Sequence, residues 1–205
     1  EAGTELLGEL LELSRIKTRP QKRQMVDFQE LLEDLKGAFE YELKQKNITL
    51  TVHSPMPRLY VEHSRMRQLF QNLIDNAIKY MARRDDGRID VGYRRAEDMH
   101  VFSVADNGPG VAAEDQQRIF HVFRRGSGEA SGEVQGKGVG LALVRTIAQN
   151  YDGWAWVESR PGHGATFLVA LSAEKTQPPQ ERADHGSDRH QPQGAVVPEG
   201  AASRG

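Results

Sequence analysis

Apolar and polar residues alternate along the chain with two spacings, one typical of helices and one typical of strands. The helical spacing of three and four residues, with local start and stop signals, predicts helices over residues 4–16, 27–43, 64–81, 114–123 and 138–151. A spacing of two predicts strands around residues 48–52, 59–61, 89–93, 101–104, 155–158 and 165–171. This order predicts an α+β fold, a two-layer sandwich in which helices cover one face of a mixed sheet.

Individual residues mark where several of these elements begin and end. Pro20 ends the first helix, because proline lacks the N–H that a helix interior needs. Asp27 followed by Glu30 is typical of a capping box at a helix start. Asn47 is suited to the left-handed residue that stops the second helix, and Gly153 is suited to the end of the last one.

The apolar pattern also divides the chain into parts. We expect a helix end and linker over residues 1–25, one folded domain over 26–172, and a disordered tail over 173–205, which is rich in Pro, Gln, Gly and Ser. Residues 124–137 hold few apolar anchors and predict a mobile loop. The chain begins at Glu1, so we expect upstream segments, and any membrane contact would come through them.

Composition narrows the possible functions. The 205 residues carry a formal net charge of −2, which gives no support to nucleic acid as a partner. There is no cysteine, which excludes disulfides, thiolate zinc sites and cysteine nucleophiles. No apolar run approaches the roughly 20 residues that a membrane helix needs. Together these properties are compatible with a cytoplasmic domain.

The helix over residues 64–81 has a polar edge that is a candidate for chemistry. Asn72, Asn76, Lys79 and Arg83 follow one another at steps of three and four residues, so they share one face. An amide oxygen can bind Mg²⁺, which prefers oxygen ligands, and the cations can meet phosphate. Taken alone, the same pattern also fits an ordinary solvated helix face.

Three glycine-rich segments follow, each after or before a predicted element. The segment 106–110 reads Asp-Asn-Gly-Pro-Gly after a strand, where its carboxylate can accept a hydrogen bond from an exocyclic amine. The segment 136–141 precedes a helix, whose first N–H groups can hold phosphate oxygens. It matches neither a P-loop nor a dinucleotide fingerprint. The segment 162–167 by itself predicts only a hairpin turn.

The order of these segments resembles the catalytic ATP-binding domain of sensor histidine kinases. Residues 72–80 are similar to that family's N box, and residues 106–110 to its first glycine box. Residues 119–125 resemble the F box, 136–141 the second glycine box and 162–167 the last one. The resemblance covers about residues 26–172 and implies the Bergerat ATP-binding fold of the gyrase, chaperone and mismatch-repair superfamily.

The resemblance implies roles for single residues. Asn76 would bind Mg²⁺, and with Asn72 and Lys79 it would act on the phosphates; Asp106 would accept from the adenine amine. The residues expected to contact the nucleotide are Asn72, Asn76, Lys79, Tyr80, Asp106, Gly108, Gly110, Arg125, Gly136, Lys137, Gly138, Val139, Gly140, Leu141 and Thr166. The F box departs from the family pattern, with His121 and Val122 in place of Glu-Pro. This departure affects the packing of the lid rather than Asp106 or Asn76.

The implied reaction is transfer of the γ-phosphoryl group of ATP to a histidine. The family's phosphoacceptor motif is absent from all seven histidines of the chain, so the acceptor would lie outside it. Implied partners are the receiver domain of a response regulator and a second copy, joined through upstream dimerisation helices that residues 10–16 would end. Two alternatives remain open: an ATPase of the same superfamily, which carries a carboxylate where this chain has Asn72, and a non-catalytic nucleotide-binding module.

Overall fold

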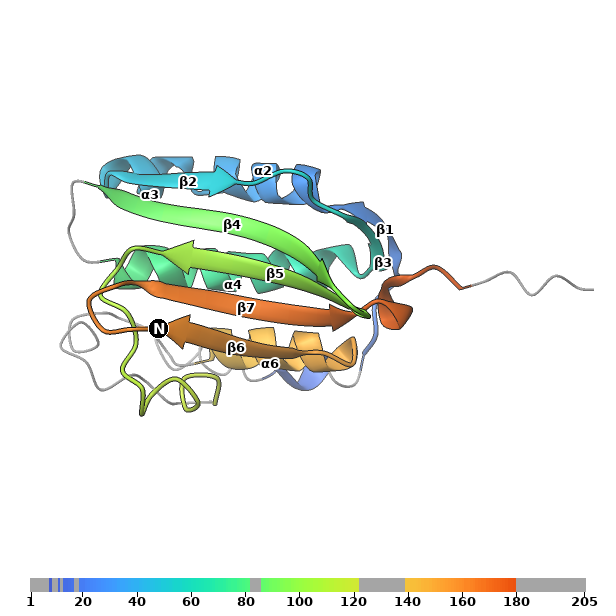
Figure 1. Cartoon of the computed structure of the whole chain (residues 1–205). Helices are drawn as coiled ribbons and strands as arrows, with labels where there is room; N and C mark the ends of the chain where they lie inside the picture. Colours follow the sequence, from blue (N-terminus) through green and yellow to red (C-terminus); the bar gives the residue numbers. More distant parts are fainter. Residues whose placement is uncertain are drawn as a thin grey trace, which may run out of the picture.

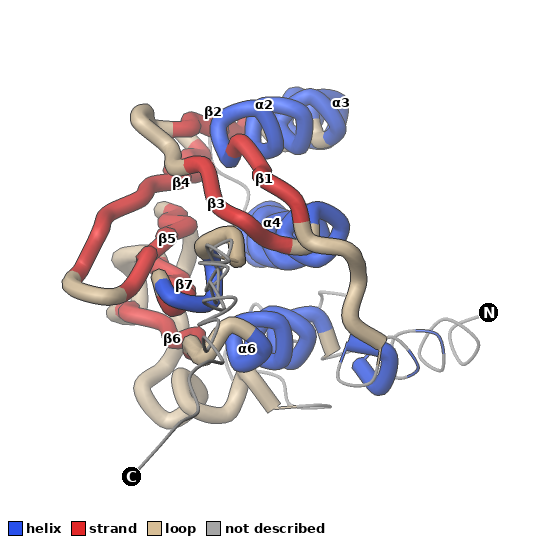
Figure 2. Tube along the Cα trace, turned by 90° about the vertical axis from the view of Figure 1, so that its right-hand side faces the viewer, coloured by secondary structure: helices blue, strands red, loops and turns tan. Residues whose placement is uncertain are grey.

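The computed structural model describes residues 8, 11, 13–16, 19–81, 86–121 and 139–179, and these form two layers. Figure 2 shows the sheet on one side and the helices on the other. The sheet has the strand order β2-β4-β5-β7-β6, in which β2 and β4 are parallel and the other neighbours antiparallel. Its strands are β2 (Ile48–Val52), β4 (Gly87–Ala96), β5 (Met99–Asp106), β7 (Ala165–Ser172) and β6 (Trp154–Ser159). The predicted α+β sandwich is confirmed.

The helices labelled in Figure 1 lie on one face of this sheet. They are α2 (Phe28–Ala38), α3 (Glu40–Gln45), α4 (His63–Tyr80) and α6 (Gly140–Asn150). The side chain of Asp27 accepts hydrogen bonds from the N–H groups of Gln29 and Glu30, so it caps α2 as predicted. Asn47 has a φ of 53°, the left-handed conformation expected at the helix stop. Among the helices of the described part of the chain, none is both long and apolar enough to cross a membrane.

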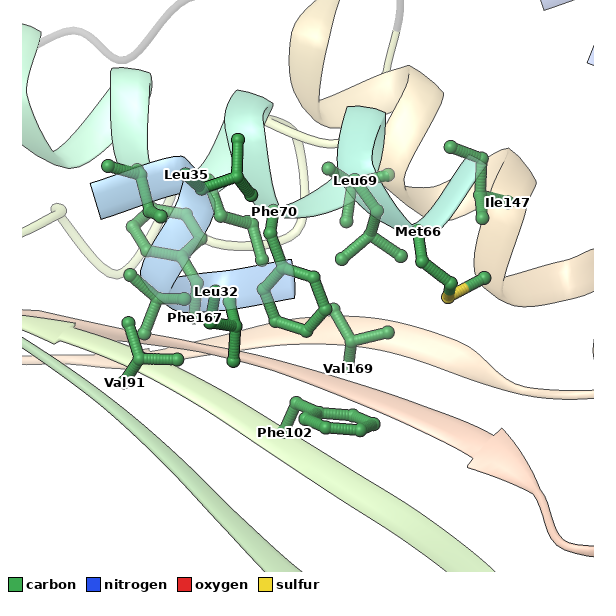
Figure 3. Close-up of a cluster of buried hydrophobic side chains, with 14 of the residues drawn as sticks. Leu32, Leu35, Met66, Leu69, Phe70, Val91, Phe102, Ile147, Phe167 and Val169 are labelled. Carbon is green, nitrogen blue, oxygen red and sulfur yellow. The ribbon is translucent and has the colours of Figure 1, made fainter. Parts of the chain in front are cut away.

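The core fills the space between the two layers (Figure 3). Phe102 of β5 stacks on Phe28 of α2 with ring centroids 4.8 Å apart, and Phe70 of α4 meets both rings edge-on. Residues 102, 104 and 106 alternate along β5, so Asp106 lies on the same face as Phe102. Because Phe102 is held in the core between the sheet and the helices, the Asp106 side chain points to the helix side of the sheet.

The structure differs from the sequence prediction in several places. The expected helix over 27–43 is interrupted at Phe39, two residues after Gly37, a poor helix former. A second sheet was not predicted; it pairs β1 (Gln24–Asp27) with β3 (Arg58–Val61). Residues 113–121 form successive turns and a bend, where a regular helix over residues 114–123 was expected.

The expected tail also differs from the structure over its first residues. Residues 173–179 are described, and Glu174–Thr176 form a 3-10 helix. The Thr176 hydroxyl is buried and donates to the carbonyls of Ser172 and Ala173. The expected disorder of the rest of the tail, and the expected mobile loop over 124–137, lie outside the described residues.

The linker before β1 contacts the N-terminal end of α4, at Glu62, and the C-terminal end of α6, at Tyr151. Glu62, only 5% exposed, precedes α4, and its carboxylate accepts from the Gln21 N–H. The buried Tyr151 hydroxyl accepts from the Glu62 N–H at 2.9 Å and donates to the Glu62 carboxylate at 3.2 Å. Burial raises the pKa of Tyr151 to about 12, so its hydroxyl stays protonated as a donor. Arg23 lies over the Tyr151 ring at 4.7 Å and donates to the Lys175 carbonyl.

Tyr151→Phe is expected to lower the free energy of unfolding by about 1–3 kcal/mol. The substitution leaves the buried N–H and carboxylate of Glu62 without the hydroxyl that pairs with both. Urea denaturation measures the loss. Tyr41→Phe is the control, because Tyr41 is 78% exposed, and it should leave stability within about 0.5 kcal/mol. Equal effects of the two substitutions would contradict the role given to the Tyr151 hydroxyl.

Candidate nucleotide site

Asp106 is the last residue of the central strand β5, at the end of the sheet near which α4 also ends. Its Oδ1 accepts a hydrogen bond from the Gly108 N–H at 2.9 Å, and the Ala165 N–H of β7 donates to the same carboxylate. Burial raises the pKa of Asp106 above its usual value, and the two N–H groups oppose that rise. A partly buried carboxylate with acceptor capacity left over is suited to recognise a donor such as an exocyclic amine.

The loop that follows Asp106 is bound to the start of β4 through its first residue, Asn107. Asn107 accepts from the Arg88 N–H at 2.8 Å through Oδ1 and donates to the Asp86 carbonyl at 2.8 Å through Nδ2. Both polar atoms of the Asn107 side chain therefore form hydrogen bonds to the backbone of the protein itself. It holds the loop at the position that lets the Gly108 N–H reach the Asp106 carboxylate.

The glycines of this region are required by the protein's own packing. Gly110 has a φ of +78°, and a Cβ there would lie 2.5 Å from the Arg160 carbonyl oxygen. Gly164, in the hairpin between β6 and β7, has a φ of +82°, and its Cβ would lie 2.0 Å from the Asp106 carbonyl oxygen. Sequence reasoning predicted that Gly108 and Gly110 admit a base. In the structure Gly110 lies against the β6–β7 hairpin, and the approach of a base to these glycines stays a prediction.

Gly164→Ala is expected to destabilise the fold by at least about 3 kcal/mol, because the added methyl group would overlap the backbone of Asp106. Gly162 provides a matched control, since its φ is +79° and nothing lies within 4 Å of its Cβ position. Gly162→Ala should cost only the conformational strain, about 1–2 kcal/mol. Chemical denaturation compares the two. Losses of the same size would show that the close contact with Asp106 is unimportant.

The polar face of α4 contains the two predicted amides and Lys79, whereas Arg83 lies outside the described residues. Asn72 donates from Nδ2 to the Gln68 carbonyl at 2.8 Å, and its Oδ1 lies 2.7 Å from where a Cβ of Gly140 would be. The α4 helix and the first residue of α6 are therefore in close contact through Asn72. The Lys79 ammonium lies 2.6 Å from the Asp75 carboxylate, one turn earlier on the same helix. In this conformation Lys79 points along the helix instead of outward to a phosphate.

Asn76 lies between these two contacts and is half-buried. Within the described ranges, no hydrogen bond involves its side chain and no group of three or more His, Cys, Asp or Glu residues is placed to hold a metal. An amide oxygen with free acceptor capacity fits one position of Mg²⁺, which keeps several waters and takes its other ligands from phosphates. The residues present therefore fit a cation that arrives with a nucleotide.

The α4 helix joins the two ends of the site. At its C-terminal end, a Cβ of Gly108 would lie 3.5 Å from the Tyr80 carbonyl oxygen. Asn72, eight residues earlier, meets α6, so the two contacts are about 12 Å apart along the helix axis. The site is elongated, with the Asp106 carboxylate at one end and the first turn of α6 at the other.

The glycine segment before α6 is described only in part. Val139 is fully buried in the core, Gly140 begins α6 against Asn72, and Leu141 is partly buried against the core. Val139 can therefore offer a ligand only its backbone. Gly136, Lys137, Gly138 and Arg125 lie outside the described residues.

Thr166 lies on the face of β7 opposite to the one that carries Asp106 on β5, so its predicted contact with the nucleotide is not supported by its position. Thr166 pairs with Ala105 on β5, whereas its neighbour Ala165 pairs with Asp106. Because successive strand residues point to opposite faces, Thr166 shares a face with Leu168 and Ala170, away from the helices. Ala165 is the residue that stands beside Asp106.

Two residues at the site were missed by sequence reasoning. Ser159, the last residue of β6, donates from Oγ to the Gly164 carbonyl at 2.6 Å and accepts from the Val111 N–H at 2.8 Å. Gln116 donates from Nε2 to the carbonyls of Ser159 and Val111. Neither belongs to a glycine segment, so no motif indicated them.

The F-box segment is described as far as His121. Phe120 is buried and meets Phe167 of β7 with ring centroids 6.3 Å apart. His121 lies 3.4 Å from an Arg145 guanidinium nitrogen on α6. The departure at His121 thus contacts α6, while residues 122–125 of the F box lie outside the described part.

Comparison with known proteins identifies relatives of the whole domain. A family model described as histidine kinase-, DNA gyrase B-, and HSP90-like ATPase matches residues 61–175. Cyanobacterial phytochrome A of Nostoc sp. is 35% identical over 166 residues, which are 81% of this chain and 21% of that protein. The methanogenesis regulatory histidine kinase FilI of Methanothrix harundinacea is 32% identical over 81% of this chain and 18% of its own length. The chain thus spans about a fifth of these relatives.

Solved structures agree with the fold. Full-length ShkA in complex with AMPPNP superposes with a TM-score of 0.68 and 28% identity, over 82% of this chain and 35% of that one. The histidine kinase AdeS of Acinetobacter baumannii has a TM-score of 0.67 and 24% identity, over 83% of this chain and 78% of its own. The chain therefore belongs to the family of histidine kinase-, DNA gyrase B- and HSP90-like ATPases, and it has the ATP-binding catalytic domain of the histidine kinases.

Proposed function

We propose that this domain binds ATP with Mg²⁺ and donates the γ-phosphoryl group to a histidine that lies on an upstream segment of the same signalling protein. The observation that carries the proposal is the placement of the partly buried Asp106 carboxylate, at the end of β5, beside the α4 helix that carries Asn72 and Asn76. Asp106 would read the adenine amine, and the first turn of α6 would face the phosphates. Tyr80, at the end of α4, would border the base.

In phosphoryl transfer the protein mainly positions the reacting groups and neutralises the negative charge of the phosphates. A nitrogen–phosphorus bond forms to the acceptor imidazole, and the bond from the γ-phosphorus to the bridging oxygen breaks, which releases ADP. Asn76 would hold the cation, which when bound offsets phosphate charge. Lys79 would leave Asp75 to contact phosphate, and Arg125 and Lys137 would add charge from the segment between Phe120 and α6.

The position of Asn72 favours phosphoryl transfer to protein over hydrolysis. The superfamily's ATPases carry a carboxylate at this position to activate water, and an amide cannot take up that proton. In this chain the Asn72 amide is used to bind the Gln68 carbonyl and to contact Gly140. A water nucleophile would therefore lack its base.

The surrounding organisation is proposed on the same grounds. The linker contacts of Gln21 and Arg23 support a layout in which residues 1–25 connect an upstream dimerisation helix to the domain. A structure of histidine kinase ThkA with response regulator TrrA, 23% identical over 47% of that chain, supports a receiver domain as partner. We propose that the domain is cytoplasmic, dimerises through upstream helices, meets a membrane only through upstream segments and has no nucleic-acid partner.

The test uses a protein extended upstream to include the acceptor helices. Radiolabelled ATP should give phosphate on the protein that acid removes and base does not, the signature of phosphohistidine. Free phosphate in the absence of labelled protein would indicate an ATPase. Neither product, with ATP still bound, would indicate a binding module.

A further inference from the structure

We propose that Ser159, supported by Gln116, is a positioning residue that sets the site's preference for adenine over guanine. The inference deepens the proposed function and rests on it. We call this cluster of hydrogen bonds the Ser159 clamp. It consists of the side chains of Ser159 and Gln116 and of the backbone groups that they bind, which belong to Val111, Ser159 and Gly164.

The Ser159 hydroxyl joins two loops that are far apart in the sequence. It donates to the Gly164 carbonyl at 2.6 Å, within the β6–β7 hairpin, and accepts from the Val111 N–H at 2.8 Å, in the loop after β5. One hydroxyl thus uses its donor and an acceptor lone pair on two backbone groups. The Gly162 N–H donates to the Pro109 carbonyl at 2.7 Å, so the same two loops meet again beside it.

Gln116 fastens this junction from the segment that leads toward α6. Its amide donates to the Ser159 carbonyl at 3.0 Å and to the Val111 carbonyl at 3.2 Å. Both side chains therefore bind Val111: the Ser159 hydroxyl binds its N–H group and the Gln116 amide binds its carbonyl. The clamp connects three parts of the chain: the loop after β5, the β6–β7 hairpin and the turns over 113–121.

Asp106 stands between the two loops that the clamp joins. On one side, Gly108 donates to its carboxylate from the loop that continues to Val111. On the other side, Ala165 donates to the same carboxylate directly after Gly164, whose Cα is packed against the Asp106 carbonyl. The clamp holds both donors in place. It thereby fixes which carboxylate lone pairs remain for a ligand and where they point.

The direction of those lone pairs decides between purines. Adenine presents an amine at position 6, which donates to a fixed carboxylate, whereas guanine presents an oxygen there, which that carboxylate repels. Recognition of this kind weakens when the acceptor gains freedom to turn, because selectivity is a difference between two affinities. Ser159 does not touch the base in this arrangement; it acts through Asp106.

The experiment measures binding of ATP and of GTP, each with Mg²⁺, by calorimetry or competition. Ser159→Ala should weaken ATP binding by about tenfold, since two backbone groups lose their partner, and should leave GTP binding nearly unchanged. The ATP-to-GTP affinity ratio should therefore fall by about the same factor. Ser159→Thr, which keeps the hydroxyl, should restore the ratio. Ser172→Ala, at the opposite end of β7, should leave it at the wild-type value.

Gln116→Ala provides a second variant in case Ser159→Ala does not fold, and it should lower the ratio in the same direction by a smaller factor. A Ser159→Ala protein, or failing that a Gln116→Ala protein, that keeps the wild-type ratio would overturn the clamp even if both affinities fell together. In that case a wild-type preference for ATP leaves the proposed function standing. A wild-type chain that binds neither nucleotide would overturn the proposed function, and the clamp with it.

Discussion

Asp106→Asn should weaken ATP binding by about 10- to 100-fold while leaving the folded domain at least as stable as the wild type. A hydrogen bond to a charged group contributes about 1.5–3 kcal/mol, which corresponds to that range. The substitution keeps the size of the side chain. It changes only the charge and one acceptor oxygen.

The loss follows from the partners that Asp106 has in the protein. Its carboxylate already accepts from the N–H groups of Gly108 and Ala165. An asparagine would turn its one oxygen toward those donors, which leaves its NH₂ group facing the adenine amine. Two donors would then oppose each other at the base.

The stability effect follows from the raised pKa. Burial makes the ionised form of Asp106 unfavourable in the folded state, so the folded protein holds this proton more tightly than the unfolded chain does. The contribution of Asp106 to stability is therefore present below the unfolded pKa and is lost as pH rises through the folded pKa. At neutral pH the wild type carries this cost, and an uncharged asparagine removes it.

Titration calorimetry and thermal melting measure the two effects on the same samples. Asp98→Asn, in the exposed turn between β4 and β5, is the control and should change neither. ATP affinity of the wild type should also fall as acid protonates Asp106, at a higher pH than for an ordinary aspartate, and the Asp106→Asn substitution should remove that part of the pH dependence. Unchanged affinity in Asp106→Asn would place adenine elsewhere.

Asn76→Ala should remove most of the Mg²⁺ dependence of ATP binding. In wild type, Mg²⁺ should strengthen ATP binding by at least about tenfold, because loss even of groups that only support a metal ligand costs about 10- to 100-fold. Alanine has no oxygen to take the metal position. ATP affinity with Mg²⁺ should then approach the affinity measured with a chelator present.

The matched control is Gln71→Ala, on the exposed side of the same helix, which should retain the full Mg²⁺ effect. Binding is titrated with and without the cation for wild type and both variants. If Asn76→Ala kept the wild-type dependence, the metal would be held by other residues.

The sequence predicted those helices and strands whose apolar residues recur at a regular helical or strand spacing. The α4 stripe from Met66 to Ile78 repeats at helical spacing, and the structure buries it. β1 was missed, because four residues carry little periodicity and the strand exists only through its pairing with β3. The turns over 113–121 likewise depend on contacts such as those of Gln116, which no local pattern contains.

The sequence predicted some residues of the candidate site and not others. Asp106 was identified by its motif, and the structure supplies the burial and the two N–H partners. The face of Thr166 could also be read from the sequence, since counting back from the buried Phe167 along the strand places Thr166 on the opposite face. The pairing of Lys79 with Asp75 was also visible as a four-residue helical spacing. Ser159 was not predictable, because its partners come from loops brought together only by the fold.

A crystal structure of the domain with a non-hydrolysable ATP analogue and Mg²⁺ examines the central claim most directly. The adenine amine should lie within about 3 Å of the Asp106 carboxylate, and the side-chain oxygen of Asn76 should bind the cation beside the phosphates. A nucleotide bound at another surface, or a base turned away from Asp106, would contradict it.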